Sequence, residues 1–122
     1  MNHVFVINNA TRKEYDVPCT ILVGRSPDCD IRILEPSISR YHIYFSIFHD
    51  DTCFIGDGNP VNGQGSRNGF LLKGKVYKRE NTKVAFVELF GGEKIQIGAN
   101  TTIEYIKFRE EEEDSDATLE ME

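Results

Sequence analysis

The sequence predicts an all-β protein, either a sandwich or a barrel. Short runs rich in Val, Ile, Phe, Tyr and Thr recur along the chain, and turn residues such as Gly, Asn, Asp and Pro separate them. No long window keeps the 3.6-residue period of an amphipathic helix. Many short strands with frequent turns are typical of sandwiches and barrels.

Eleven segments carry this strand signal: 3–7, 14–17, 20–24, 30–33, 41–48, 53–56, 69–72, 76–78, 83–89, 94–98 and 102–108. In the last segment, alternation predicts that Ile103 and Tyr105 face the core, and that either Ile106 or Phe108 is the next core residue. FGGEK at 90–94 predicts a tight hairpin turn, because glycine supplies the positive φ that such turns need.

Charge divides the chain into two parts. The whole sequence has 14 Lys and Arg against 20 Asp and Glu, a net charge of −6. Eight of those acids and no base lie in 110–122, which leaves 12 acids and 14 bases in 1–109. A run of like charge without aromatic residues cannot bury enough apolar surface to become ordered. We therefore expect one domain over 1–109 and an acidic disordered tail or linker over 110–122.

Several functional classes find no support in the sequence. There is no apolar run long enough to span a membrane and no signal-peptide pattern at the N-terminus. Cys19, Cys29 and Cys53 have no CxxC spacing and are expected to be free thiols in a reducing cytoplasm. The histidines show no paired ligand spacing, so we expect no metal site, and we expect no cofactor.

The segment SISRYH at 37–42 contains residue types found in catalytic pairs. Ser39 could be a nucleophile and His42 its base, but catalysis also needs a group that orients the base and an oxyanion site. Ser39 does not lie in a G-x-S-x-G turn, and no acid is placed to orient His42. We therefore do not expect an enzyme.

Two other segments favour plain structural interpretations. GDGNPVNGQGSRNG at 56–69 has neither dinucleotide-binding nor P-loop spacing, so its part 58–65 is interpreted as a long hairpin loop. KGKVYKRENTK at 73–83 has five bases but only one aromatic residue for stacking on bases. That favours a solvated hairpin, and we expect no nucleic-acid partner.

A third interpretation of the polar loops is an anion pocket. The residues concerned are Arg25, Ser39, Arg40, Arg67 and Asn68, all in loops or at loop–strand boundaries. A phosphate monoester needs positive charge and several hydrogen-bond donors, which arginine, serine and asparagine supply. Residue chemistry alone leaves two alternatives open, because it does not decide whether these loops converge or the arginines are unrelated surface residues.

Four segments, in this order and spacing, resemble a forkhead-associated (FHA) domain. They are VGRSPDCDI (23–31), SISRYHIYF (37–45), GSRNGFLLKG (65–74) and ELFGGEKIQIG (88–98). The resemblance covers 4–108, and the combination of G-R, S-x-x-H and S-x-N-G is far more specific than any one of them. It implies an SMAD/FHA-like sandwich of about eleven strands in two sheets, whose loops at one end bind phosphothreonine peptides.

The resemblance also implies roles for the five polar residues. Arg25 would contact the phosphate or the peptide backbone, and Ser39 would donate a hydrogen bond to the phosphate. Arg40 occupies the next position, where the family often has a basic or polar phosphate ligand. Asn68 would hold the peptide main chain beside the phosphothreonine, and Arg67 could also reach the peptide.

Three further residues would shape the loops. Gly24 would form the first loop, His42 would brace the binding loop without touching ligand, and Gly69 would form the turn after Asn68. The chain departs from the family pattern at Phe70, where threonine is usual, and in the long loop 57–65, which could make contacts of its own.

The resemblance therefore predicts a cytoplasmic phosphothreonine-dependent binding module in Ser/Thr kinase signalling, with a phosphothreonine-containing protein as its partner. The alternative keeps the fold but makes it an interaction or scaffold domain that acts without phosphate. Some bacterial FHA proteins carry a phosphorylatable threonine beside the domain. Thr118 in the acidic tail is a candidate for such regulation, docking into the protein's own pocket once phosphorylated. A solubilising tail or linker is the alternative.

Overall fold

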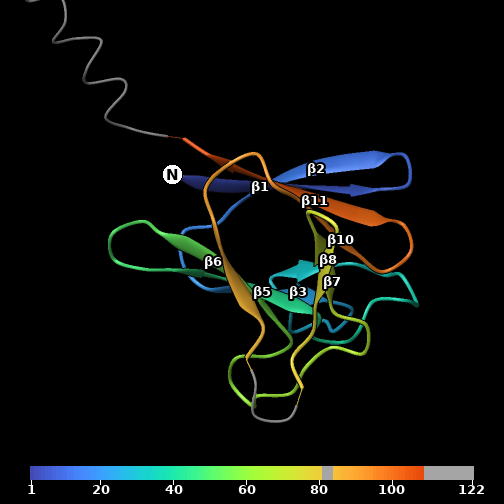
Figure 1. The fold of residues 1–122 in the computed structure, drawn as a ribbon. Coiled ribbons are helices and arrows are strands. Elements are labelled where there is room, and N and C mark those ends of the chain that lie inside the picture. The colour runs from blue at the N-terminus through green and yellow to red at the C-terminus, as the bar shows by residue number, and fades with distance from the viewer. Residues whose placement is uncertain (81–83, 109–122) are drawn as a thin grey trace, which may run out of the picture.

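The computed structural model describes residues 1–80 and 84–108 and shows a β-sandwich (Figure 1). The predicted tail 110–122, with Thr118, lies outside the described residues, and so does the end of the predicted domain at 109. Among the described residues there is no helix long and apolar enough to cross a membrane. Cys29 and Cys53 are buried and Cys19 is exposed, each as a free thiol.

Eleven strands correspond one for one to the eleven predicted segments, which confirms the fold class. They are β1 (Asn2–Asn8), β2 (Thr11–Asp16), β3 (Ile21–Gly24), β4 (Ile31–Arg32), β5 (Ile43–Ile47), β6 (Cys53–Asp57), β7 (Phe70–Leu72), β8 (Lys75–Tyr77), β9 (Phe86–Leu89), β10 (Lys94–Ile97) and β11 (Thr101–Lys107). A six-stranded sheet has the order β2-β1-β11-β10-β7-β8, and a five-stranded sheet has the order β4-β3-β5-β6-β9.

Alternate side chains of the two sheets fill the space between them. Val4, Phe45, Ile103 and Tyr105 are all fully buried there. Burying a side chain of this size stabilises the fold by about 1.5–3 kcal/mol. Beyond Tyr105 the pattern ends, since Phe108 remains 50% exposed.

Two connections expected to be hairpins instead cross from one sheet to the other. The glycine turn at 91–92 joins β9, which pairs with β6, to β10, which pairs with β11. The segment 58–65 likewise leads from β6 in the five-stranded sheet toward β7 in the six-stranded sheet. Glycines indicate where a chain can turn, but they do not indicate which strand pairs with the next one, so the hairpin prediction was wrong in both places.

Antiparallel pairing brings several loops to one end of the sandwich. Val23 near the end of β3 pairs with Ile43 at the start of β5, and Ile43 also pairs with Asp57 at the end of β6. The loops that carry Arg25, Ser39 and the segment 58–69 therefore start or finish at the same end.

A buried carboxylate joins two loops at this end. Glu35 is only 7% exposed and accepts hydrogen bonds from Ser37 Oγ, from Thr101 Oγ1 (2.7 Å), and from the backbone N–H groups of Ala99 (2.7 Å) and Asn100 (3.0 Å). Burial by itself would raise the pKa of Glu35, but the hydrogen bonds favour the ionised form and bring that pKa below its ordinary value. Glu35 thus fixes the β10–β11 turn against the loop before β5.

Glu35→Gln should lower the free energy of unfolding near neutral pH by about 1–3 kcal/mol, because an NH₂ group would face backbone donors. The lowered pKa means that ionised Glu35 contributes stability above the unfolded-state pKa of about 4.3, and that this contribution is lost as the pH falls. Urea unfolding across this range should show the difference between wild type and variant shrinking toward acid pH. The exposed Glu88→Gln is the control, and a difference independent of pH would contradict the assignment.

Candidate functional site

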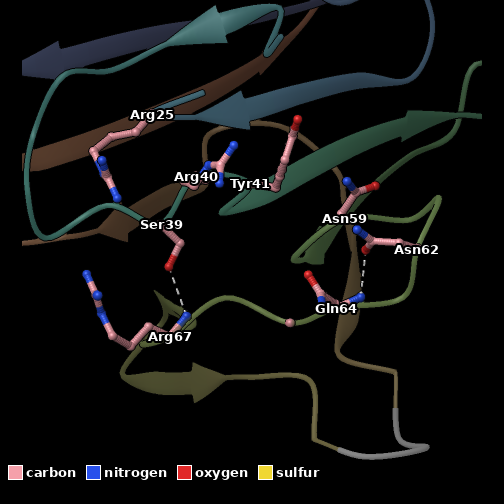
Figure 2. Close-up of a pocket in the computed structure, with 9 residues that line it drawn as sticks. Arg25, Ser39, Arg40, Tyr41, Asn59, Asn62, Gln64 and Arg67 are labelled. Atoms are coloured by element: carbon pink, nitrogen blue, oxygen red, sulfur yellow. Dashed lines mark hydrogen bonds between the residues drawn. The ribbon is translucent and has the colours of Figure 1, made fainter. Parts of the chain in front are cut away.

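A pocket of about 470 Å³ opens where these loops meet (Figure 2). Four of the predicted anion-binding residues line it: Arg25, Ser39, Arg40 and Arg67. The rest of its wall is formed by Tyr41 and by four residues of the β6–β7 connection, namely Asn59, Asn62, Gln64 and Gly65. The structure thus favours convergence over the alternative of unrelated surface arginines.

Backbone contacts hold the two loops that carry Arg25 and Ser39 together. The N–H of Arg25 donates to the carbonyl of Ser39, and the N–H of Ser26 donates to the carbonyl of Arg40, each at 3.1 Å. Gly24 lies so close that a Cβ atom there would be 2.2 Å from the carbonyl oxygen of Arg40. Only glycine permits that approach, so Gly24 shapes this side of the pocket.

Three of the predicted anion-binding side chains, those of Arg25, Ser39 and Arg67, form hydrogen bonds with neighbouring residues. Arg25 Nε donates to the carbonyl of Ile38 (2.6 Å), which leaves its terminal nitrogens free for a ligand. Arg67 Nη2 donates to the carbonyl of Pro36 (3.2 Å). Ser39 Oγ accepts from the N–H of Arg67 (2.9 Å), so the hydroxyl proton of Ser39 remains available to donate.

His42 connects the Ser39 loop to the start of β7. It is fully buried, its Nδ1 accepts from the N–H of Ser39 (2.9 Å), and its Nε2 donates to the carbonyl of Gly69 (2.7 Å). Gly69 has φ of 75° and its N–H donates to Ser66 Oγ (2.7 Å). Because both ring nitrogens of His42 are used in this way, His42 does not contact the Ser39 hydroxyl as a catalytic base would.

Burial lowers the pKa of His42 below its ordinary value, and this outweighs the hydrogen bond to Gly69, which raises it. The imidazole is therefore neutral at physiological pH. That state suits its contacts, because a protonated Nδ1 could not accept the hydrogen bond from Ser39.

Asn68 is exposed and lies beside the cationic pocket instead of lining it. It borders a neighbouring groove of about 400 Å³ together with Ser37, Phe70, Gly98 and Ala99. A side chain in this position suits contact with a peptide main chain that continues past the pocket. Phe70, which stands where the family usually has threonine, is 1% exposed and packs into the core.

The pocket has an unbalanced positive charge. Arg25, Arg40 and Arg67 all line the pocket, and none of its lining residues is Asp or Glu. The ion pairs formed among the described residues involve Met1, His3 and Arg12, and none involves a pocket arginine. Three guanidinium groups are thus available to an anion.

Sequence analysis did not single out three polar residues of the pocket, Asn59, Asn62 and Gln64. Their segment has the glycine content of an ordinary loop, and its length relative to the family pattern was the one signal that it could make contacts of its own. Their place in the pocket depends on the path of the β6–β7 connection between the sheets.

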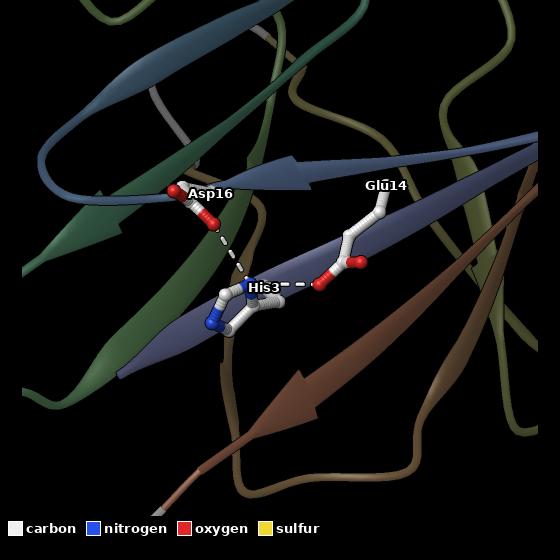
Figure 3. Close-up of side chains that lie close together, drawn as sticks. All are labelled: His3, Glu14 and Asp16. Atoms are coloured by element: carbon white, nitrogen blue, oxygen red, sulfur yellow. Dashed lines mark ion pairs between the residues drawn. The ribbon is translucent and has the colours of Figure 1, made fainter.

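A second polar cluster lies on the β1–β2 hairpin (Figure 3). His3 Nδ1 is 2.8 Å from Asp16 Oδ1 and 3.1 Å from Glu14 Oε2, and the three potential metal-ligand atoms lie within 4.8 Å of one another. The sequence spacing did not predict this cluster because cross-strand pairing brings His3 to Asp16. Since Asn8 at the other end of β1 contacts Glu35, the cluster lies away from the pocket loops.

The fold and site define a β-sandwich whose loops at one end form a cationic pocket. The model of the FHA domain family matches residues 21–98, and the chain belongs to this family. FHA domains are phosphothreonine-binding modules, not enzymes.

Three comparisons illustrate the relationship. The FHA domain-containing protein PS1 of Arabidopsis thaliana is 36% identical over 84 residues, which is 68% of this chain but 5% of that much longer protein. The Slr1951 protein of Synechocystis sp. has a crystal structure that matches with a TM-score of 0.71 and 27% identity, covering 88% of this chain and 96% of that one. A structure from a study of phosphothreonine-dependent FHA domain interactions matches with a TM-score of 0.65 and 17% identity, covering 89% and 99%.

The depressed pKa of His42 predicts a pH-dependent stability. The unfolded chain would bind a proton at His42 below its pKa of about 6.5, whereas the folded chain resists doing so until lower pH. The free energy of unfolding should therefore fall as the pH drops from about 7 toward the folded-state pKa.

His42→Gln should reduce this pH dependence and cost about 1–3 kcal/mol of stability at neutral pH, because buried partners lose their hydrogen bonds. Denaturant unfolding at several pH values measures both effects. The exposed His49→Gln should keep the wild-type slope, and an unchanged slope in the His42 variant would contradict the prediction.

Proposed function

We propose that this chain binds phosphothreonine-containing peptides or proteins through the pocket of Arg25, Ser39, Arg40 and Arg67. The observation that carries the proposal is the presence of three unneutralised guanidinium groups beside an available serine hydroxyl. A phosphate dianion needs this combination of positive charge and hydrogen-bond donors. The biological setting that we propose is cytoplasmic signalling downstream of a Ser/Thr kinase.

Each residue has a distinct part in the proposed complex. Arg25 and Arg67 would donate to phosphate oxygens from orientations already set by Ile38 and Pro36. Ser39 would donate its hydroxyl proton, and Arg40 would add charge from a side chain that makes no hydrogen bond to a described residue. Asn68 would hold the peptide main chain as it leaves the pocket for the adjoining groove.

A second candidate function, phosphate-independent protein interaction, is favoured by an aromatic surface on the five-stranded sheet. Phe48 and Phe86 are both about half exposed, and each packs against Phe54 with ring centroids 5.0 and 5.6 Å apart. A partner bound at this surface would have no need of the charged pocket.

The sequence also motivates a regulatory proposal for Thr118. A threonine tethered to the same chain as a cationic pocket can have a high effective concentration at that pocket once it is phosphorylated. We propose that phosphorylated Thr118 occupies the pocket, in the same molecule or in a neighbouring one.

Matched peptides that carry threonine, phosphothreonine or phosphoserine test the main proposal by titration. Phosphothreonine should bind, threonine should not, and phosphoserine should bind about fivefold more weakly for lack of one methyl group. Arg25→Ala should cost about 1.5–3 kcal/mol of binding, as loss of a charge-assisted hydrogen bond does.

Ser39→Ala should weaken the same binding, while Lys94→Ala, which removes a positive charge outside the pocket, should leave it almost unchanged. Equal binding of all three peptides would exclude the phosphate-dependent function. Binding that survives Arg25→Ala but is lost when Phe86 is changed to serine would favour the aromatic surface.

For Thr118, a peptide of residues 110–122 phosphorylated at this position should shift the NMR signals of residues 24–42 and 66–69. The unphosphorylated peptide and one phosphorylated at Ser115 are the controls. If the Thr118 phosphopeptide leaves these loops unchanged, the tail does not regulate the pocket.

A further inference from the structure

The β6–β7 connection contains a closed loop, residues 58–65, that can be considered apart from the strands on either side. The two residues that flank it are hydrogen-bonded to each other, because Asp57 accepts from both the N–H (3.1 Å) and the hydroxyl of Ser66. Within the loop, the N–H of Asn59 donates to the carbonyl of Gln64 (2.8 Å), and the N–H of Gly63 donates to the carbonyl of Asn59 (2.9 Å). The loop is therefore an ordered wall of the pocket.

The amide side chains of this wall present hydrogen-bond donors to the pocket. Asn59 Oδ1 accepts from the N–H of Val61 (2.8 Å), and Asn62 Oδ1 accepts from the N–H of Gln64 (2.9 Å). These contacts fix which end of each amide is the oxygen. The Nδ2 groups of Asn59 and Asn62 make no hydrogen bond to a described residue, and both side chains line the pocket. A ligand group that meets them must accept hydrogen bonds.

The positive charge of the pocket indicates that the hydrogen-bond acceptor on the ligand is an anion. Arg25, Arg40 and Arg67 bring three positive charges, and no lining residue is acidic. A phosphate monoester at neutral pH supplies a charge of about −1.5 to −2. With the phosphate bound, roughly one positive charge remains uncompensated. A carboxylate matches this remainder, because it has one negative charge and only acceptor atoms.

The arrangement of the pocket provides room for such a group beside the phosphate. In Figure 2, Ser39 and Arg67 lie on one side, Asn59 and Asn62 lie on the other, and Gln64 extends into the space between them. Asn68 borders the separate groove. If the peptide residues on one side of the phosphothreonine pass Asn68, the residues on its other side would lie over loop 58–65.

We infer that loop 58–65 forms a second subsite, which binds the carboxylate of an Asp or Glu close to the phosphothreonine in the ligand. The inference rests on the proposed function and adds to it a rule of selectivity. Phosphate binding belongs to the arginines and Ser39, whereas preference for a neighbouring acidic residue belongs to Asn59, Asn62 and Gln64.

The test uses a phosphothreonine peptide with alanine at the two positions before and the two positions after the phosphorylated residue. Asp is placed at each of these positions in turn, and affinity is measured by fluorescence anisotropy. At one position or more, Asp should strengthen binding by about five- to tenfold, in keeping with a charge-assisted hydrogen bond that is partly exposed. Asn at the same position should recover little of the gain, and Lys should weaken binding.

Asn62→Asp is the decisive variant. Its carboxylate can still accept the hydrogen bond from the Gln64 N–H, so the loop keeps its conformation, but the donor that faces the pocket becomes an acceptor with a negative charge. The preference for Asp in the peptide should disappear, and Lys at that position should now be favoured over Asp. Asn9→Asp, in the β1–β2 turn outside both the pocket and the groove, makes the same change of charge and should keep the preference.

The alanine-flanked phosphothreonine peptide separates the two possible failures. If it binds, and Ser39→Ala weakens that binding, but Asp adds nothing at any of the four positions, the second subsite is refuted and the proposed function stands. Equal effects of Asn62→Asp and Asn9→Asp would also refute it, since they would show only long-range attraction. If phosphoserine at one of the four positions strengthens binding more than Asp does there, the assignment of the subsite to a carboxylate is wrong. If no phosphothreonine peptide binds, both the function and the subsite are wrong.

Discussion

The neutral imidazole of His42 is the contact on which the binding end of the molecule depends. The Ser39 loop precedes β5 in one sheet, and Gly69 precedes β7 in the other, so His42 joins loops that the two sheets position separately. Together with the hydrogen bond from the Arg67 N–H to Ser39 Oγ, this side chain holds the loop of Ser39 at a fixed distance from the segment of Arg67. Its burial lowers the pKa of the ring and so disfavours the charged form, and the neutral ring with its proton on Nε2 forms hydrogen bonds with both loops at once. Ser39 and His42 therefore lie close together in the sequence because both shape the pocket: His42 holds its loops, and the Ser39 hydroxyl remains available to donate a hydrogen bond.

Two buried carboxylates extend this arrangement without neutralising the pocket. Asp57 accepts hydrogen bonds from Ser66 and from the backbone of Arg79 (2.8 Å), and Glu35 accepts from the β10–β11 turn. Both carboxylates accept hydrogen bonds from backbone N–H and side-chain O–H groups, and neither is paired with an arginine side chain of the pocket. A carboxylate paired with Arg25 or Arg67 would stabilise an empty pocket and compete with an incoming phosphate. The loops at this end are thus fixed by one set of charged residues while another set remains available for ligand.

Much of the fold followed from local patterns, because alternation of apolar residues and turn residues between them are properties of neighbouring positions. Ile103 and Tyr105 were placed in the core on this basis, and both are buried. Which strands pair is not a local property, so the turn at 91–92 and the loop 58–65 were wrongly expected to close hairpins. The same limit applied to the site. Arg25, Ser39 and Arg67 were recognised through motifs that recur in the FHA family, whereas Asn59 and Asn62 belong to a segment outside those motifs. Their place in the pocket depends on where the connection between the sheets passes, and no local pattern encodes it.

The hydrogen bonds between Asp57 and Ser66 make the residues that position Arg67 independent of loop 58–65, which forms one wall of the pocket. Because they close the base of loop 58–65, the position of Arg67 depends on Asp57, Ser66 and His42 more than on the loop that lies between them in sequence. Residues within the loop can then change with little effect on the positions of Ser39 and Arg67. The proposed phosphate contacts and the proposed selectivity for neighbouring residues thus lie in different segments of the chain. In a binding module whose phosphate contacts are shared across a family, a loop of this kind is where one member can acquire a partner of its own.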